Sequence, residues 1–342
     1  MKYDKPFLTY DQQIQHLKTQ YKLNILNNKF ALEALSSVSY YDLINGYKEC
    51  MMDNGVFKHF VSIEYLYLFY LFDKNFQNVI FKHSLFVENF FKTKLAYVLA
   101  EDFGVDIKDY LANKNLNYSY HNKIFLHKVK EEIKNGYTKF DKYGNKFYTQ
   151  QPIKHYILNH NHIPPWILLK NISFSNAISL YKLLKPTQKQ KVTENILQTT
   201  NIDINEKIQF LTAALDFIRN YRNQIAHNLK FVTYKNERCK LPYHITNKII
   251  NDKNLSKNNE KYNDIYSCIL ATFILLNNSL LQSKYVYEIF SVINTPPLDT
   301  PQFKKIQLLI SSDYLNITGL TADFPLKLKA FSEYLQRHNN LK

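Results

Sequence analysis

Residues 203–228 read DINEKIQFLTAALDFIRNYRNQIAHN and carry the most regular hydrophobic pattern in the chain. Aliphatic residues recur there at alternating spacings of four and three, with one gap of seven: Ile204, Ile208, Leu211, Leu215, Ile218 and Ile225. Because that period matches one face of an α-helix, we expect a long amphipathic helix with a buried stripe. Arg222 stands at the position that would fill the gap. A charge there is costly to bury unless it is paired, or faces a cleft or a second subunit.

Arginine is scarce in this chain, and its placement narrows the function. Of the 44 basic residues, four are arginine: Arg219, Arg222, Arg238 and Arg337. Arginine presents a planar, always charged fork to phosphate or carboxylate, a task that lysine performs poorly. Arg222 opens the motif R-N-x-x-x-H, which continues with Asn223 and ends at His227. This motif is typical of ribonucleases.

The expected helix places the motif residues so that they could cleave RNA. Residues four apart share a helix face, so Asn223 and His227 are expected to stack. Arg219 lies one turn before them, and Arg222 flanks this ridge and leans toward the buried stripe. A histidine can transfer a proton near neutral pH, and an arginine can hold the scissile phosphate. The RNA 2′-hydroxyl would attack and leave a 2′,3′-cyclic phosphate. Arg222, Asn223 and His227 are thus the candidate catalytic residues, with no metal or cofactor.

The same residues also allow simpler roles. Arg222 could pair with a buried acid such as Glu88, and His227 could only cap a helix. Glu88 stands on an otherwise apolar helix face, where it could form a structural ion pair or orient Arg222 or His227. Three classes of function therefore stay open. The protein could be an endoribonuclease, a non-catalytic RNA-binding module, or an interaction protein whose motif serves only dimerisation.

The charge of the chain points to RNA as a partner. The formal net charge is +15, which favours a polyanionic partner over a surface that is basic only for solubility. Residues 108–154 hold ten lysines and four acids among tyrosines, a mixture suited to phosphate contact and base stacking. The candidate RNA-binding residues are Arg219, Lys230, Lys123, Lys128, Lys139, Lys142 and Lys146.

The remaining sequence predicts an all-α protein with one small β-hairpin. Six glycines are few, and apolar spacing predicts helices over 10–23, 29–35, 61–102 and 265–281. Thr9 and Gln12 predict a capping box that opens the first of them. Another helical region is expected from 164–166 to about 198, interrupted at Pro186. The alternating stretch 137–148, around Gly144 and Asn145, predicts the hairpin. Trp166 is expected to anchor the core. We divide the chain into an N-terminal helical segment (1–55), a helical core (56–233) with a basic insertion (about 104–162), and a linker followed by C-terminal helices (234–342).

Several classes of protein are disfavoured. The three cysteines, Cys50, Cys239 and Cys268, are far apart and lack metal-ligand spacing, which fits a reducing cytoplasm. No glycine-rich nucleotide loop is present, and the N-terminus lacks the apolar core of a signal peptide. No apolar run in the first third approaches the length of a membrane helix. The histidines between 155 and 162 lack the further ligands of a metal site.

The stretch Arg222–His227 resembles the signature of HEPN domains (higher eukaryotes and prokaryotes nucleotide-binding). Residues 5–235 as a whole resemble the Abi-like family, abortive-infection proteins of the AbiD and AbiF kind. The supporting stretches are KPFLTYDQQ (5–13), VSYYDL (38–43), LFDK (71–74), VEN (87–89), PW (165–166) and SF (173–174). The resemblance implies a HEPN-type helical bundle, a homodimer with two facing motifs, phage defence and a small non-coding RNA partner. The chain has Ser175, Asn228 and Lys230 where family members usually have Gly, or a second His or an Arg.

Overall fold

The structure is a computed structural model of the 342-residue chain. It describes residues 5–117, 123–124, 127, 130–131, 138–140, 142–148, 152–199, 201–250, 255–256, 262–295 and 301–339. Within these ranges the fold is all-α, with two small two-stranded antiparallel sheets. The predicted fold class is therefore confirmed.

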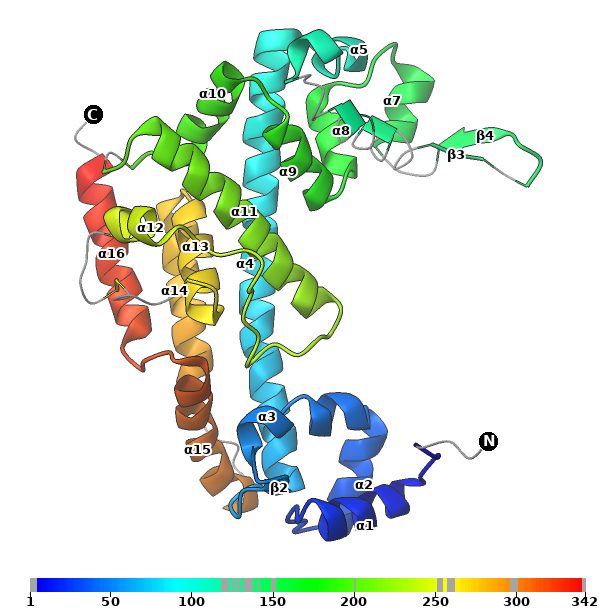
Figure 1. The fold of residues 1–342 in the computed structure, drawn as a ribbon, viewed down its shortest axis with the longest axis vertical. Coiled ribbons are helices and arrows are strands. Elements are labelled where there is room, and N and C mark those ends of the chain that lie inside the picture. The colour runs from blue at the N-terminus through cyan, green and yellow to red at the C-terminus, as the bar shows by residue number, and fades with distance from the viewer. Residues whose placement is uncertain are drawn as a thin grey trace.

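A single helix, α4 (Ile63–Phe103), forms the axis of the molecule (Figure 1). Its 41 residues span about 60 Å at the usual rise of an α-helix. The Ser62 side chain accepts a hydrogen bond from the Tyr65 N–H and caps the first turn, and Gly104 ends the helix at a φ of 82°. Six other helices pack against α4: α8 (Pro165–Asn171), α10 (Pro186–Ile196), α11 (Ile204–Ala226), α13 (Ile265–Leu275), α14 (Ser279–Ile293) and α15 (Pro301–Thr318). The helix predicted over 61–102 is thus one uninterrupted element.

The N-terminal elements close around one end of α4. The predicted capping box is present, because Thr9 and Gln12 exchange hydrogen bonds at the start of the first helix. Glu64, fully buried on α4, accepts the backbone N–H groups of Leu26 and Asn27 and so ties the second helix to α4. The elements are α1 (Tyr10–Gln20), α2 (Asn28–Ser37), the short π-helix η1 (Tyr41–Asn45), α3 (Lys48–Met51), β1 (Met52–Asp53) and β2 (Val56–Phe57).

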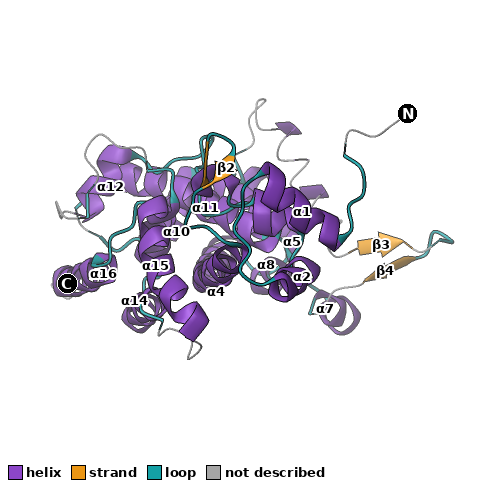
Figure 2. Ribbon diagram, turned by 90° about the horizontal axis from the view of Figure 1, so that it is seen from below, coloured by secondary structure: helices purple, strands orange, loops and turns teal. Residues whose placement is uncertain are grey.

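The predicted hairpin is present in the segment that follows α4 in the chain. Thr138 pairs with Tyr148 and Phe140 with Lys146, in strands β3 (Thr138–Phe140) and β4 (Lys146–Tyr148). Gly144 adopts a φ of 82° in the turn. Figures 1 and 2 show the hairpin standing away from the helices gathered around α4. Its neighbours in the chain are α5 (Ile107–Tyr110), η2 (Asn113–Asn115) and α7 (Ile153–Asn159).

Three helices lie between α7 and the helix that carries the motif. Two of these helices begin with a proline: Pro165 and Pro186 occupy first-turn positions, where the missing N–H of proline costs no hydrogen bond. Ser173 caps a further helix start, which the sequence analysis missed, by accepting the Asn176 N–H. Trp166 is 50% exposed, so the expectation that it anchors the core is wrong. The helices are α8 (Pro165–Asn171), α9 (Phe174–Lys182) and α10 (Pro186–Ile196).

The helix predicted over 203–228 is α11 (Ile204–Ala226), and it begins with a capping box between Asp203 and Glu206. Its buried stripe differs from the predicted one. The core position after Ile218 is taken by Tyr221, which is fully buried and donates to the Tyr234 carbonyl. Arg222 is therefore no interruption of the core; its side chain is 30% exposed beside the stripe. The buried residues of α11 are Phe210, Leu211, Ala214, Leu215, Phe217, Ile218 and Tyr221.

The C-terminal helices pack along the same axis as the core. The helix predicted over 265–281 is two helices, because the first ends at Leu275 and Asn278 caps the next by accepting the Leu281 N–H. None of the described helices is both long and apolar enough to pass through a lipid bilayer. The elements are α12 (Tyr243–Ile250), α13 (Ile265–Leu275), α14 (Ser279–Ile293), α15 (Pro301–Thr318) and α16 (Phe324–Asn339).

One buried carboxylate joins the two ends of the chain. Asp73 on α4 is 2% exposed and accepts hydrogen bonds from the Tyr47 hydroxyl (3.1 Å), the Tyr314 hydroxyl (2.9 Å) and the Gln77 amide (2.8 Å). Burial raises its pKa to about 6, although the hydrogen bonds from Tyr314 and Tyr47 oppose this shift. Asp73 thus connects the N-terminal segment, α4 and α15 at one point.

Candidate functional site

The C-terminus of α11 is fixed by a specific cap. Asn228 follows His227 in the left-handed conformation, with a φ of 52°. Its N–H donates to the Ile225 carbonyl (3.1 Å), and the Leu229 N–H donates to the Gln224 carbonyl (2.9 Å). This is a Schellman cap with Asn in the place usually taken by Gly. The backbone just after the motif therefore turns sharply away from the helix axis.

The side chain of Asn228 extends this cap to two other parts of the fold. It donates to the Asp42 carboxylate of η1 (2.9 Å) and accepts a hydrogen bond from the Lys74 ammonium of α4. Ser39 in turn donates to Asp42 (2.8 Å). The end of the motif helix is thus held by the N-terminal segment and by the central helix.

A groove of about 790 Å³ lies along one side of the end of α11. We call it the motif groove. Side chains of α9, α11 and the segment 234–239 line it, and its charged members are Lys182, Asp216, Arg219 and Arg238. Asn223 and His227 lie in the same groove. The ridge of Arg219, Asn223 and His227 that helical spacing predicts is therefore one wall of this groove.

His227 is exposed at the rim of the motif groove. Its backbone N–H donates to the Asn223 carbonyl (3.0 Å), so its main chain still follows the helix. Within the part of the chain that the structure describes, its imidazole forms no hydrogen bond or ion pair. The ring is therefore available to a bound molecule.

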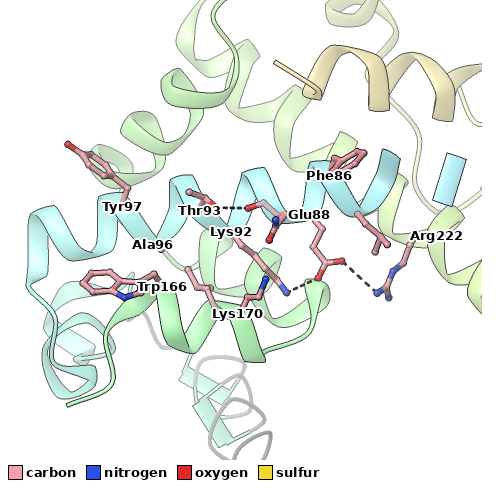
Figure 3. A pocket seen from close by; sticks show the side chains of 12 residues that line it. Phe86, Glu88, Lys92, Thr93, Ala96, Tyr97, Trp166, Lys170 and Arg222 are labelled. Atoms are coloured by element: carbon pink, nitrogen blue, oxygen red, sulfur yellow. Dashed lines mark hydrogen bonds and ion pairs between the residues drawn. The ribbon is translucent and has the colours of Figure 1, made fainter. Parts of the chain in front are cut away.

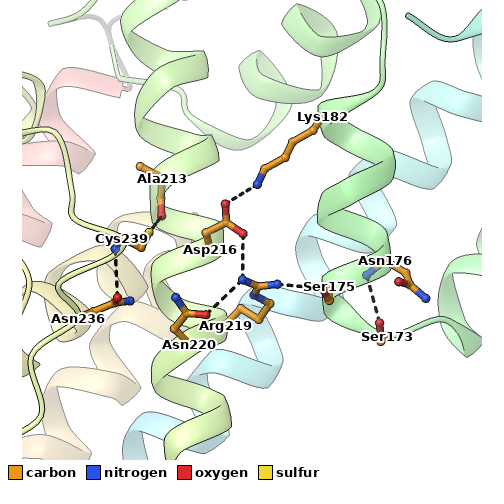
Figure 4. A network of polar contacts seen from close by, with 10 residues as sticks. All are labelled: Ser173, Ser175, Asn176, Lys182, Ala213, Asp216, Arg219, Asn220, Asn236 and Cys239. Carbon is orange, nitrogen blue, oxygen red and sulfur yellow. Dashed lines mark hydrogen bonds and ion pairs between the residues drawn. The ribbon is translucent and has the colours of Figure 1, made fainter. Parts of the chain in front are cut away.

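Arg219 is held in place from three directions (Figure 4). Its Nη1 donates to the Ser175 hydroxyl (2.8 Å) and its Nη2 to the Asn220 side chain (3.2 Å). The Asp216 carboxylate lies 3.4 Å from Nη2 and also pairs with Lys182. Ser175 thus helps to position this arginine. The guanidinium is oriented before any ligand binds.

Arg238 was not among the sequence candidates for the site. It follows Asn236, whose side chain accepts the Cys239 N–H (3.1 Å) and so shapes the turn that brings Arg238 to the motif groove. No ion pair of Arg238 exists within the described residues. The scarcity of arginine was the available signal, since the same argument that selected Arg219 and Arg222 applies to Arg238.

Arg222 lies on the other side of α11, in a second groove of about 580 Å³ between α4 and α8 (Figure 3). We call this the α4–α8 groove. The Nη2 of Arg222 is 3.6 Å from Glu88, and its Nη1 donates to the Asn223 side chain (3.3 Å). The guanidinium also lies 5.9 Å from the centre of the Phe81 ring. Glu88 pairs with Lys92 as well (2.7 Å). The ion pair between Glu88 and Arg222 is present, and an orienting role for it stays a prediction.

The structure therefore divides the motif between two grooves. Positions five apart on an α-helix differ by about 140° around its axis, so Arg222 and His227 cannot face the same way within one chain. Asn223 stands between them, accepting from Arg222 while lining the motif groove with His227. Arg219 is the motif-region arginine that shares the groove of His227.

The predicted RNA-binding lysines do not converge on this site. Lys230 pairs with Glu49 of α3 and lines neither groove. Lys142 is exposed in the hairpin turn, 4.8 Å from the centre of the Tyr143 ring, and Lys123 is also exposed. Lys128 lies outside the described residues. The other two candidates are in the hairpin strands, Lys139 in β3 and Lys146 in β4. None of the described hairpin residues lines either groove.

The motif groove offers three cations, one carboxylate, several amides and one imidazole. Among the described residues, no three His, Cys, Asp or Glu side chains gather in a way that could hold a metal ion. Guanidinium groups bind phosphate through paired donors, and an imidazole can move a proton. The groove can therefore bind a phosphodiester and act on a neighbouring hydroxyl group.

Comparison with known proteins supports one family. No curated protein and no solved structure matches the chain. The family of Abi-like proteins matches residues 33–233, a range that includes η1, α4, all of α11 and both grooves' helices. Because this match covers more than half of the 342 residues, the protein belongs to the Abi-like protein family.

Proposed function

We propose that this protein is an RNA-binding abortive-infection protein of the HEPN class that acts in phage defence and cleaves RNA without a metal ion. The observation that carries the proposal is the motif groove. Three cations, Lys182, Arg219 and Arg238, line it with one carboxylate, Asp216, and the free imidazole of His227 stands at its rim. Such a set of groups suits a phosphodiester, and the family match supports the role in abortive infection.

The proposed reaction is an internal transesterification. His227 takes the proton of the RNA 2′-hydroxyl as its oxygen bonds to the adjacent phosphorus. The bond from phosphorus to the 5′-oxygen breaks, that oxygen takes a proton from solvent water, and His227 afterwards returns its proton to solvent. The products are a 2′,3′-cyclic phosphate and a 5′-hydroxyl end. Arg219 stabilises the charge that builds on the phosphate oxygens, and Arg238 binds a neighbouring phosphate of the RNA.

The proposed active form is a homodimer. Arg222 and His227 of one chain face different grooves, so a site that uses both must draw them from two copies. We place α11 at or near the two-fold axis, where Arg222 of one copy meets the motif groove of the other. Each catalytic site would then be complete only in the dimer.

A mixing experiment tests this arrangement. Arg222→Ala and His227→Ala are each expected to abolish cleavage as homodimers. Unfolding and refolding the two variants together should restore activity, because mixed dimers contain one site with both residues intact. Failure to restore activity in verified mixed dimers would overturn the shared site. A strict monomer by light scattering, with and without RNA, would overturn the dimer itself.

Cleavage by the wild-type protein tests the reaction. Labelled RNA should be cut in the presence of a chelator, and mass spectrometry should find 2′,3′-cyclic phosphate ends. Protein purified from its native locus should carry RNA, and sequencing that RNA should identify the small non-coding partner. A requirement for a divalent metal, or linear 3′-phosphates formed directly, would contradict the mechanism. The absence of any RNA shift at low salt would contradict RNA binding.

A second function is favoured by one observation. Arg219 is already paired with Asp216, and Arg222 with Glu88, so both guanidinium groups have carboxylate partners before any RNA binds. This suits a non-catalytic RNA-binding module in which the motif serves binding and dimerisation. If the protein binds RNA tightly but cleaves none, both as the dimer and as purified with its RNA, this alternative is correct.

A further inference from the structure

Trp166 is the only tryptophan of the chain, and it lies on the surface in a fixed position. It stands in the first turn of α8, directly after Pro165, and is 50% exposed. Leu168 and Leu169 on the same helix are buried and hold α8 against α4. Half of the indole surface is thus exposed on a helix that is firmly packed against α4.

The surroundings of Trp166 are aromatic and basic. Tyr97 on α4, 60% exposed, lines the α4–α8 groove with it. Lys170 follows Trp166 by four residues, so the two share a face of α8. Figure 3 shows Trp166 and Tyr97 toward one end of the groove, Arg222 at the other, and Lys92 and Lys170 between them.

The charges of the groove favour an anionic occupant. Its ionisable lining residues are three cations, Lys92, Lys170 and Arg222, and one carboxylate, Glu88. Glu88 is already paired with both Lys92 and Arg222, and Lys92 also donates to the Ile172 carbonyl (2.7 Å). Lys170 is exposed and has no ion pair within the described residues. The rest of the lining is mainly apolar and aromatic, so the groove combines surfaces on which a base can lie with an excess of cations for its phosphates.

We infer that the α4–α8 groove is a subsite for an unpaired base of bound RNA, which stacks on the face of Trp166 while the adjoining phosphates contact Lys170 and Arg222. This inference deepens, and rests on, the RNA binding proposed above. Aromatic side chains bind unpaired bases of any sequence by stacking, and nearby cations follow the backbone. From Glu88 to Tyr97 the groove follows α4 for about 14 Å, so the strand runs from Trp166 toward α11.

The single tryptophan makes the test specific to this site. A His227→Ala background prevents cleavage during the measurement. Single-stranded RNA of roughly 12 nucleotides is titrated while intrinsic tryptophan fluorescence is recorded, and affinity is measured separately by the anisotropy of labelled RNA. We expect the single strand to quench the fluorescence. The same sequence as a blunt duplex should quench far less, because its bases are already stacked on one another.

Variants then separate stacking from general binding. Trp166→Ala should weaken single-strand binding roughly 5- to 150-fold, the equivalent of one stacked base. Trp166→Phe keeps an aromatic face and should stay within about threefold of the parent. Tyr287→Ala, which removes a 69% exposed aromatic ring on α14 outside both grooves, should have no effect.

Each outcome decides one of the two proposals. If anisotropy detects no RNA binding at all, the proposed function fails and the subsite fails with it. If RNA binds but fluorescence does not change, and Trp166→Ala binds like the parent, the subsite is wrong while RNA binding stands. Equal quenching by duplex and single strand would also overturn the stacking of an unpaired base.

Discussion

The two grooves beside α11 differ in chemistry although they share one helix. The motif groove is polar, with His227, Asn223 and two arginines along or opposite one face of α11. The α4–α8 groove has the aromatic rings of Trp166 and Tyr97 toward one end and Phe86 and Arg222 toward the other. One side thus carries groups that can move protons and stabilise charge, and the other carries surfaces that can hold a nucleic-acid strand.

We expect this difference to separate residues that set the cleavage rate from residues that set the affinity for RNA. A change of His227 in the motif groove should alter the rate of cleavage more than the affinity for RNA, because a proton-transfer group acts mainly in the transition state. Changes around Trp166 should alter affinity more than rate. Arg222 stands at the boundary, where a change is expected to affect both.

The largest effect is expected in the motif groove. His227→Ala should lower the rate of RNA cleavage by about 10²- to 10⁴-fold, because it removes proton transfer. Affinity and thermal stability should stay nearly unchanged, since the side chain is exposed. Single-turnover cleavage, RNA binding and thermal unfolding check this. His244→Ala, at an exposed histidine of α12 outside both grooves, is the matched control. Unchanged cleavage by His227→Ala would remove the catalytic interpretation.

The next effect distinguishes the two arginines of α11. Arg222→Lys and Arg219→Lys each keep the charge and lose the fork, so cleavage should fall about 10²- to 10³-fold. Arg219→Lys should also lose part of its contacts with Ser175 and Asn220, and so should show the greater disorder of the motif groove. Single-turnover rates over a range of RNA concentrations separate rate from affinity. Full activity of both Lys variants would show that bare charge suffices in both grooves.

The third prediction concerns Asp73, which lines neither groove. The pKa of Asp73 is raised by burial from its ordinary 3.8 to about 6, so the folded chain holds this proton more tightly than the unfolded chain. The resulting stability is fully present below pH 4 and is lost as the pH rises to about 6, a change of about 3 kcal/mol. Asp73→Asn should abolish this slope.

Chemical denaturation between pH 4 and 7 measures the free energy of unfolding for both proteins. Asp53→Asn, at an exposed carboxylate of β1, should leave the slope as it is in the parent. RNA affinity at neutral pH should be the same for Asp73→Asn and the parent. Parallel pH profiles for Asp73→Asn and the parent would show that this carboxylate does not titrate with folding.

The smallest effect is expected at Arg238. If Arg238 contacts one phosphate, Arg238→Ala should weaken binding several-fold and reduce the slope of log affinity against log salt by about 0.7. Binding isotherms at several salt concentrations measure this slope. Lys329→Ala removes one charge from an exposed position of α16 outside both grooves and is the control. An unchanged slope for Arg238→Ala would place the RNA backbone elsewhere.

Local signals in the sequence were sufficient for much of the fold. The capping box at Thr9 and the apolar spacing of 61–102 and 203–228 predicted helices that the structure contains. Gly144 and the alternation around it predicted the hairpin. The starts capped by Ser173 and Asn278 were missed, because a single polar residue in an otherwise helical pattern does not by itself end a helix.

The site was predictable only as far as one helix determines it. Arg219, Asn223 and His227 share a face because of helical geometry, and the structure places them together. The expectation that position 222 interrupts the buried stripe was wrong, because Tyr221 takes that place, whereas the expected pairing of Arg222 with Glu88 is present. Arg238 and Trp166 join the grooves through tertiary packing of other segments, which no spacing rule contains. The catalytic role of the motif and the division into three segments stay predictions.

The cap at Asn228 has a consequence for how small the working protein can be. Its side chain is bound to Asp42, which lies some twenty residues before α4 begins, so the last turn of α11 depends on a segment distant in sequence. A fragment starting at α4 would contain every motif residue and still lack the contact that sets the backbone after His227. The family match, which begins at residue 33, includes that contact. A working fragment therefore has to include Asp42 as well as α11, because the Asn228–Asp42 contact holds the backbone after the motif.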